Sequence, residues 1–278
     1  MIMLGTKQHL QITELCAEGA YLDGGQLGEV FLKKSEVPEY LEEGDSVQVF
    51  IYQDNLGHPT ATTKDVIAQV GDFALLRVKE INKIGAFLDI GIDKDILSPY
   101  NEQKPKMREG YSYLVKLYLD NASKRICASS NLKKFLDKET PSYKPNEEVD
   151  LIVASKTDIG FKVIINDSHT GVVFFNTVFK RLFIGQKLKG FIKQVREDGK
   201  IDVVLEKQGV QKFIDLGEQI LSELKNSEGF IPLGDKSDPE EIKKRFGSSK
   251  ANFKKAIGGL FKQGLIDIEA KSISLKEK

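Results

Sequence analysis

The sequence has few of the residues that build metal sites or disulfide frameworks. Its 278 residues include two cysteines, three histidines and no tryptophan. Cys16 and Cys127 fall on different expected strands, which suggests packed thiols in a reducing compartment rather than a disulfide. The histidines at positions 9, 58 and 169 are isolated, so no metal site is expected. No cofactor is implied.

Long apolar runs are missing as well. No stretch of about 18 apolar residues or more occurs, so no membrane span is expected. Residues 1–12 lack a charged segment followed by an apolar stretch and a cleavage site, and no secretory signal is apparent. We therefore expect a cytoplasmic protein without a membrane partner.

An excess of one charge is also absent. The 41 Lys and Arg residues equal the 41 Asp and Glu residues, and the formal net charge is 0. This balance argues against a protein that coats nucleic acid by bulk charge. It leaves open a local basic groove, because the local distribution of charge sets the field that a phosphate meets.

Recognisable catalytic motifs do not occur. No glycine-rich loop ends in Lys-Ser or Lys-Thr, and no nucleophile stands beside a base. Gly258 and Gly259 lie inside an expected helix, where glycine lowers helix propensity, so we expect another element to pack closely there. An enzyme is not expected, and no catalytic residue is assigned.

The sequence does contain a repeated pattern. Residues 76–91, LRVKEINKIGAFLDIG, alternate on both sides of Gly85, which predicts two antiparallel strands joined by a tight bend. Similar stretches surround Gly19 and Gly160, and a second set of glycines follows at positions 44, 110 and 185. Each landmark glycine of the second copy follows its counterpart in the first copy by 66 residues. Each landmark glycine of the third copy follows its counterpart in the second by 75 residues. Two landmarks that keep the same separation indicate three internal repeats.

Each copy shows five expected strands in about 60 residues, which is typical of a closed oligonucleotide/oligosaccharide-binding (OB-fold) barrel. After residue 208 the period becomes helical. A helix over residues 213–224, an extended piece over 229–233, helices over 239–246 and 250–263 and a two-stranded ribbon over 265–275 follow in the order of a winged helix-turn-helix domain.

The predicted fold class is therefore mainly β with a C-terminal α+β domain. We expect three tandem five-stranded OB-fold barrels over residues 1–66, 67–135 and 144–207, followed by a winged-helix domain over residues 212–277.

Small barrels of this kind suit single-stranded nucleic acid, because aromatic rings on the strands stack bases and basic side chains meet phosphates. Arg77 and Lys79 share one face of their strand, as do Lys116 and Tyr118. Residues 174–179 are unusually aromatic, and three rings facing inward there would be crowded. The candidate RNA-contacting residues are Tyr21, Arg77, Lys79, Lys83, Phe87, Tyr100, Lys116, Tyr118, Phe161, Lys250 and Lys254.

The residues Val78-Lys79-Glu80-Ile81 and Gly85-Ala86-Phe87 carry a resemblance to the S-one type RNA-binding domain. The resemblance implies an OB-fold barrel that binds single-stranded RNA through ring-bearing strands. The aromatic residue that this family usually has before the glycine is replaced by Glu18, Ile84 and Ile159. The histidine that usually follows the hydrophobic pair of the third strand aligns roughly with Leu32 or Ser98. The ring of Gly-Ala-Phe is retained as Tyr21, Phe87 and Phe161.

The whole architecture resembles the conserved virulence factor B (CvfB) family of bacterial RNA-binding proteins. GEVFLKKSEVP (residues 28–38) and the segment SDPEEIKKRFGSSKANFKKAIGGLFKQGLI near the C-terminus are its most specific parts. The resemblance implies cooperative binding across the domains and an influence on the expression of other genes. We therefore expect a non-catalytic single-stranded RNA-binding protein that acts as a post-transcriptional regulator.

Other functions stay open at this point. The winged helix carries Lys250, Lys254 and Lys255 on its expected recognition helix, and only Asn252 is suited to base reading there. It is therefore an accessory that contacts the RNA backbone, a reader of duplex DNA, or a protein-contacting cap. One alternative is a DNA-binding regulator that acts through the winged helix, and another is a scaffold that associates with the ribosome or another protein.

Overall fold

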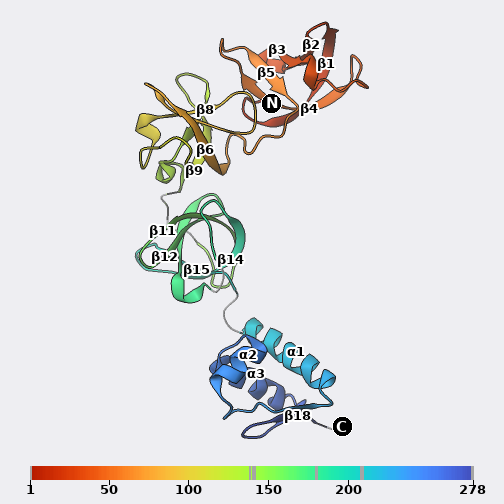
Figure 1. Ribbon diagram of the computed structural model, residues 1–278, viewed down its shortest axis with the longest axis vertical. Coiled ribbons are helices and arrows are strands. Elements are labelled where there is room, and N and C mark those ends of the chain that lie inside the picture. The colour runs from red at the N-terminus through yellow and green to blue at the C-terminus, as the bar shows by residue number, and fades with distance from the viewer. Residues whose placement is uncertain (1, 138, 140–141, 179–180, 207–209, 277–278) are drawn as a thin grey trace. The chain divides into compact units, whose positions relative to one another are not determined.

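The computed structural model describes residues 2–137, 139, 142–178, 181–206 and 210–276 (Figure 1). The chain divides into two compact units. One comprises residues 1–142, 149–189 and 196–201, and the other comprises residues 143–148, 190–195 and 202–278. The third barrel contributes strand segments to both units.

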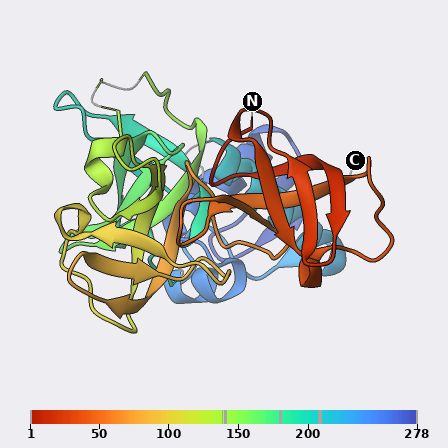
Figure 2. The same ribbon diagram turned by 90° about the horizontal axis from the view of Figure 1, so that it is seen from above.

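The first barrel consists of β1 (Lys7–Cys16), β2 (Gly19–Asp23), β3 (Glu29–Lys33), β4 (Ser46–Gln53) and β5 (Pro59–Thr62). These strands close in the order β1-β2-β3-β5-β4 (Figure 2, red to orange). The short helices η1 (Gly25–Leu27) and η2 (Lys34–Glu36) flank β3. Buried aliphatic residues, among them Leu10, Leu22 and Leu32, fill the barrel.

The second barrel consists of β6 (Phe73–Ile81), β7 (Gly85–Leu88), β8 (Ile96–Pro99), β9 (Ser112–Leu119) and β10 (Ile126–Ser129), with η3 (Tyr100–Glu102) after β8. It closes in the order β10-β8-β7-β6-β9. Along β6 the side chains alternate as expected, with Leu76 and Val78 buried and Arg77 and Lys79 exposed. The short helix η4 (Leu132–Phe135) follows the barrel.

The third barrel consists of β11 (Glu148–Lys156), β12 (Gly160–Ile165), β13 (His169–Phe174), β14 (Lys187–Val195) and β15 (Ile201–Val204), with η5 (Phe175–Thr177) after β13. Its order, β11-β12-β13-β15-β14, corresponds to that of the first barrel. The three closed five-stranded barrels confirm the predicted fold class for this part of the chain.

A β-bulge lies at the same place in all three barrels. The register of the first strand with the second shifts after Ile12, Val78 and Val153. At each site the bulge residue's carbonyl oxygen accepts a hydrogen bond from the second landmark glycine, with distances of 2.9 Å from Gly44, 2.9 Å from Gly110 and 2.8 Å from Gly185. Each of these glycines has a positive φ, between 80° and 94°. Residues with a side chain rarely adopt this conformation. The repeat spacing therefore has a structural cause.

The first set of landmark glycines is required by a close approach between strands. A Cβ at Gly19, Gly85 or Gly160 would lie 2.0, 2.3 or 2.2 Å from a carbonyl oxygen of the facing strand. Those oxygens belong to Leu32, Ser98 and Val173, which keep the same spacing as the glycines. Only glycine fits a position where two backbones come this close.

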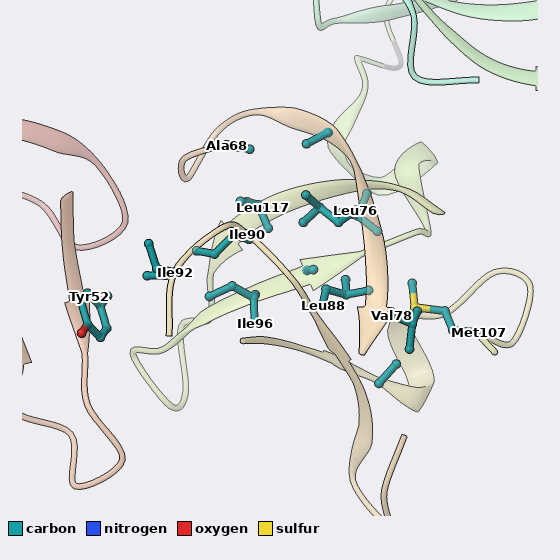
Figure 3. Close-up of a cluster of buried hydrophobic side chains, with 14 of the residues drawn as sticks. Tyr52, Ala68, Leu76, Val78, Leu88, Ile90, Ile92, Ile96, Met107 and Leu117 are labelled. Carbon is teal, nitrogen blue, oxygen red and sulfur yellow. The ribbon is translucent and has the colours of Figure 1, made fainter. Parts of the chain in front are cut away.

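The barrels of the first unit share buried apolar contacts. Phe50 and Tyr52 of β4 join the core cluster of the second barrel, and Tyr52 faces Ile92 in Figure 3. A separate cluster joins Phe73 and Leu114 of the second barrel to Ile152 and Ile164 of the third, with Leu132, Phe135, Leu136 and Ala154 packed against it. Outward faces of neighbouring barrels are therefore partly covered by one another.

The C-terminal domain contains α1 (Val210–Asn226), β16 (Phe230–Ile231), α2 (Pro239–Phe246), α3 (Lys250–Lys262), β17 (Ile266–Ile268) and β18 (Ile273–Leu275). The strands form a sheet in the order β16-β18-β17. Asp238 caps α2 by accepting a 2.7 Å hydrogen bond from the Glu240 amide, and Gly247 ends the helix in the left-handed conformation. The winged-helix prediction is confirmed.

One prediction about this domain is wrong. The glycine pair in α3 was expected to allow another element to pack closely, but no neighbouring atom lies within 4 Å of a Cβ built at Gly258 or Gly259. Both residues are only half-buried. The glycines therefore lower the helix propensity of α3 without a packing reason in the domain.

Candidate nucleic-acid interface

The second barrel exposes an aromatic and apolar surface around the turn between β6 and β7. Phe87 lies between the fully buried Ala86 and Leu88, so its ring is on the outer face of β7, where it is half-buried. Tyr100 is 44% exposed, and its hydroxyl donates a 2.6 Å hydrogen bond to the Asn82 carbonyl oxygen. Ile84 in the same turn is 58% exposed. The outward direction of Phe87 is the one that base stacking requires.

The basic residues near this surface differ in their availability. Lys79 forms ion pairs of 3.3 Å with Asp89 and 2.8 Å with Asp95. Hydrogen bonding to Asp95, opposed by partial burial, raises the pKa of Lys79, so its charge is present but shared. Arg77 and Lys83 are exposed, and among the described residues no carboxylate forms an ion pair with Lys83. Lys83 is therefore better placed than Lys79 to meet a phosphate.

Lys116 and Tyr118 lie elsewhere, on β9 beside the junction with the third barrel. The Lys116 ammonium is 4.0 Å from the centroid of the buried Phe73 ring, and burial lowers its pKa. The Tyr118 ring lies 5.3 Å from the Phe135 ring, with the Lys134 ammonium 4.6 Å from its centroid. Burial raises the pKa of the Tyr118 hydroxyl above its ordinary range. Both side chains have protein partners, and the structure does not group them with Phe87.

In the third barrel, the register corrects one equivalence taken from the sequence. In the second barrel, Phe87 pairs with Glu80 across the first two strands. In the third barrel, the residue that corresponds to Glu80 is Ser155, and its partner is Lys162. Phe161 pairs with Lys156, as Ala86 pairs with Ile81. Phe161 is therefore the counterpart of Ala86, and its identification with Phe87 and Tyr21 was wrong. A shift of one residue along a strand moves a side chain to the opposite face, which is why the ring's position cannot be carried over.

Phe161 nevertheless belongs to an aromatic cluster at the end of the third barrel. Its ring meets Phe175 edge to face at 5.4 Å, and the Lys156 ammonium lies 5.6 Å from the Phe175 centroid. Phe175 is 38% exposed, and Ile159 beside it is 59% exposed. The Phe175 amide donates a 3.2 Å hydrogen bond to the Ile159 carbonyl oxygen.

Phe175 and Lys156 were missing from the candidates chosen by sequence. The repeat spacing contains the signal, because Phe175 follows Tyr100 by the same 75 residues that separate Gly85 from Gly160. Each of the two aromatic residues opens a short helix after the third strand of its barrel. Of the aromatic segment over residues 174–179, Phe179 lies outside the described residues.

The first barrel has a smaller aromatic surface. Tyr21 is half-buried on the outer face of β2 and pairs across the strands with Phe31, whose ring lies 5.5 Å away. At the position of Ile84 this barrel carries Glu18, and Lys34 occupies the position of Tyr100. Its Lys33 is 3.7 Å from Asp93 of the second barrel. This face therefore combines two rings with mixed charges.

The winged helix places its candidate lysines at the start of α3. Ser249 caps this helix by accepting a hydrogen bond from the Asn252 amide over 3.3 Å. Lys254 is exposed and forms a 3.4 Å ion pair with Asp235, whereas Lys250 is half-buried. Part of the positive charge on this helix is thus already neutralised within the domain.

Three further observations concern metals, membranes and thiols. Over the described ranges, no group of three or more His, Cys, Asp or Glu side chains is arranged to hold a metal ion. Among the helices of those same ranges, none is long and apolar enough to cross a membrane. Cys16 and Cys127 are both free thiols, and burial raises the pKa of Cys127 to about 11.

Comparison with known families identifies domains at both ends of the chain. Residues 4–64 match the S1 domain, and residues 218–275 match the CvfB-like winged helix domain. Both domain types bind nucleic acids, through an OB-fold barrel in the first case and a helix-turn-helix in the second. Nucleic acid is therefore the class of partner that these domains indicate.

Similar proteins extend the likeness along the chain. The uncharacterized protein YitL of Bacillus subtilis is 28% identical over 94% of this chain and 90% of its own length. Proteins named conserved virulence factor B from Staphylococcus epidermidis and Staphylococcus haemolyticus are each 27% identical over 99% of this chain, and over 96% and 95% of their own lengths.

A solved structure described as a multidomain protein with nucleic acid binding domains from Streptococcus pneumoniae aligns over 98% of both chains, with 26% identity and a TM-score of 0.41. The chain combines an S1 domain with a CvfB-like winged helix domain and is similar to proteins named conserved virulence factor B along nearly its whole length, which confirms the resemblance identified in its sequence.

Proposed function

We propose that this protein binds single-stranded RNA without catalysing a reaction on it, and that it regulates gene expression after transcription. The observation that supports this most directly is a repeated exposed surface on the second and third barrels. Tyr100 with Ile84 and Phe175 with Ile159 occupy corresponding positions, and each pair leaves an aromatic ring and an aliphatic side chain in solvent.

Such surfaces fit unpaired bases. An aromatic ring on a barrel face can stack against any base, and each stacked base contributes about 1–3 kcal/mol to the free energy of binding. Lys83 in the second barrel and Lys156 in the third lie close to these rings in the sequence or in space, and neither forms an ion pair with a carboxylate of the described residues. Phosphates of a bound strand can therefore reach both cations.

The winged helix offers few side chains for reading duplex DNA. The major groove is read by side chains at the start of a recognition helix. In α3 the Lys254 charge is shared with Asp235, and Asn252 is half-buried. We therefore infer that the winged helix assists binding through backbone contacts. The regulatory role is supported by the relatives named conserved virulence factor B, and a cytoplasmic location by the two free thiols.

The proposal is tested by titrating the full chain with labelled single-stranded RNA, single-stranded DNA and duplex DNA of about 12 nucleotides, a length within the range bound by OB-folds. Measurements at about 50 and 200 mM salt report the number of phosphate contacts. We expect the highest affinity for single-stranded RNA. Tight binding of duplex DNA without affinity for single strands would contradict the proposal. No affinity for any of the three nucleic acids would favour a protein scaffold.

A further inference from the structure

A cleft of about 530 Å³ lies between the second and third barrels, within the first unit. Its walls come from the start of β9 (Ser112, Tyr113 and Leu114), from the connecting segment with η4, and from β11 and β12 of the third barrel. The volume is within the range of sites that hold small organic ligands. None of the aromatic surfaces described above forms part of it.

The floor of this cleft is apolar and fixed. Leu114 and Ile164 are buried in the cluster that joins the two barrels, and Leu132 and Leu136 of the connecting segment pack against the same cluster. Tyr113 borders the cleft, but its ring packs against the core of the second barrel, where its hydroxyl accepts a 3.0 Å hydrogen bond from the Arg108 amide. A flat apolar group therefore finds a preformed surface here.

The polar part of the cleft carries one sign of charge. Lys104, Lys133 and Lys162 line it, and none of its described lining residues is Asp or Glu. Among the described residues no carboxylate forms an ion pair with any of these three lysines. Burial, followed by the nearby charge of Lys133, lowers the pKa of Lys162. Two neighbouring ammonium groups without a counterion destabilise each other, and a bound anion relieves this repulsion.

We propose that this cleft binds one nucleotide unit of a single RNA strand, with the base on the apolar floor and the phosphate between Lys133 and Lys162. The inference rests on the proposed function and adds a specific site to it. A nucleotide matches both halves of the cleft, since it joins a planar base to an anion. The strand would then pass between the two exposed ring surfaces through the junction of their barrels.

The test uses the full chain with both lysines changed, Lys133→Gln and Lys162→Gln. For single strands, the slope of log affinity against log salt changes by about 0.7 for each phosphate that the protein neutralises, so losing the one phosphate of the cleft should reduce the slope by about 0.7. The matched control is Lys187→Gln with Lys193→Gln, which removes two exposed lysines from β14 of the third barrel. We expect the control to keep the wild-type slope. An unchanged slope in the cleft variant, or an equal reduction in the control, would overturn the proposal.

Folding is controlled by a single variant and by binding of mononucleotides. Lys133 is exposed, so Lys133→Gln alone should fold normally and reduce the slope in the same direction as the double variant, by no more than about 0.7. Uridine 5′-monophosphate should shift the amide NMR signals of residues 132–136 and 154–155 in the wild type and not in the double variant. Inorganic phosphate that shifts them with the same affinity would contradict a role for the base.

Three outcomes decide the fate of this site and of the proposed function. Wild-type protein that binds no RNA would remove both. Wild-type protein that binds RNA, loses affinity with Phe175→Ala and is indifferent to both cleft lysines would retain the function and reject the cleft. Uridine 5′-monophosphate that binds more tightly than the RNA would assign the cleft to a free nucleotide and overturn the strand assignment.

Discussion

The Phe161 and Phe175 rings meet edge to face in the third barrel, with their centroids 5.4 Å apart. The Lys156 ammonium also lies over the Phe175 ring, and Phe175 remains 38% exposed. An exposed ring supported by a second ring is pre-ordered for stacking, because little side-chain entropy is lost when a base binds.

The first prediction follows from this pair. Phe175→Ala should weaken binding of single-stranded RNA by about 1–3 kcal/mol, or roughly 5- to 150-fold, because one base loses its stacking partner. Fluorescence anisotropy with a labelled oligonucleotide measures the effect. Phe183→Ala removes another exposed ring of the same barrel and is the control. Equal losses for the two variants would show that Phe175 has no special position.

The second prediction separates two rings of the second barrel. Tyr118→Ala should destabilise the protein by about 2 kcal/mol, less than the 3–5 kcal/mol of a fully buried ring, because it removes the contacts to Phe135 and Lys134. Phe87→Ala should instead weaken RNA binding with little loss of stability. Calorimetric unfolding and RNA titration of both variants check this. A stable Tyr118→Ala variant with lost RNA affinity would reverse the assignment.

The third prediction concerns the strand contact beside the β6–β7 turn. Gly85→Ala should destabilise the second barrel by more than about 2 kcal/mol, because the new Cβ would lie 2.3 Å from the Ser98 carbonyl oxygen and 3.0 Å from the Pro99 Cα. Both are backbone atoms, so relief requires separation of β7 from β8. Urea unfolding of the full chain measures the loss, and wild-type stability in this variant would refute the steric argument.

The fourth prediction uses a glycine without neighbours. Gly259→Ala in α3 should stabilise the winged helix by about 0.5–1 kcal/mol, because alanine reduces the conformational entropy lost on folding and nothing lies within 4 Å of its Cβ. Amide hydrogen exchange in α3 should slow accordingly. Faster exchange in the variant would reveal a role for the glycine that packing within the domain does not explain.

The fifth prediction concerns pH and the Glu102 carboxylate at the end of η3. The Glu102 carboxylate accepts a 2.6 Å hydrogen bond from the Ser129 hydroxyl and lies 2.5 Å from the Lys134 ammonium. Burial raises its pKa, but the hydrogen bonds from Lys134 and Ser129 outweigh burial, so the net pKa is lowered. A carboxylate with a lowered pKa stabilises the fold above its unfolded pKa of about 4.3 and loses this contribution as the pH falls through the folded value.

Glu102→Gln should therefore lower the thermal midpoint near pH 7, and the difference from wild type should shrink once the pH falls below about 4.3. Calorimetry at a series of pH values checks this. A difference that is constant over the whole range would mean that the charge of Glu102 contributes nothing.

Much of the fold followed from the sequence because its causes are local. The glycines at positions 44, 110 and 185 mark a positive φ beside a bulge, and those at 19, 85 and 160 mark close strand contacts. Alternation along β6 and β7 correctly indicated which residues fill the barrel. The starts of α2 and α3 have an equally local cause, since each cap is a side chain within three residues of the amide that it binds.

Packing between elements decided which outward residues remain available. Lys79 is occupied by Asp89 and Asp95, and Tyr118 is covered by Phe135, although all of these look alike as exposed positions on an alternating strand. Phe161 is not the counterpart of Phe87, because it follows its glycine directly, whereas Phe87 stands two residues after Gly85. The two-residue period of a strand fixes which side chains leave the barrel, whereas a neighbouring barrel or loop that covers them leaves no signature in that period.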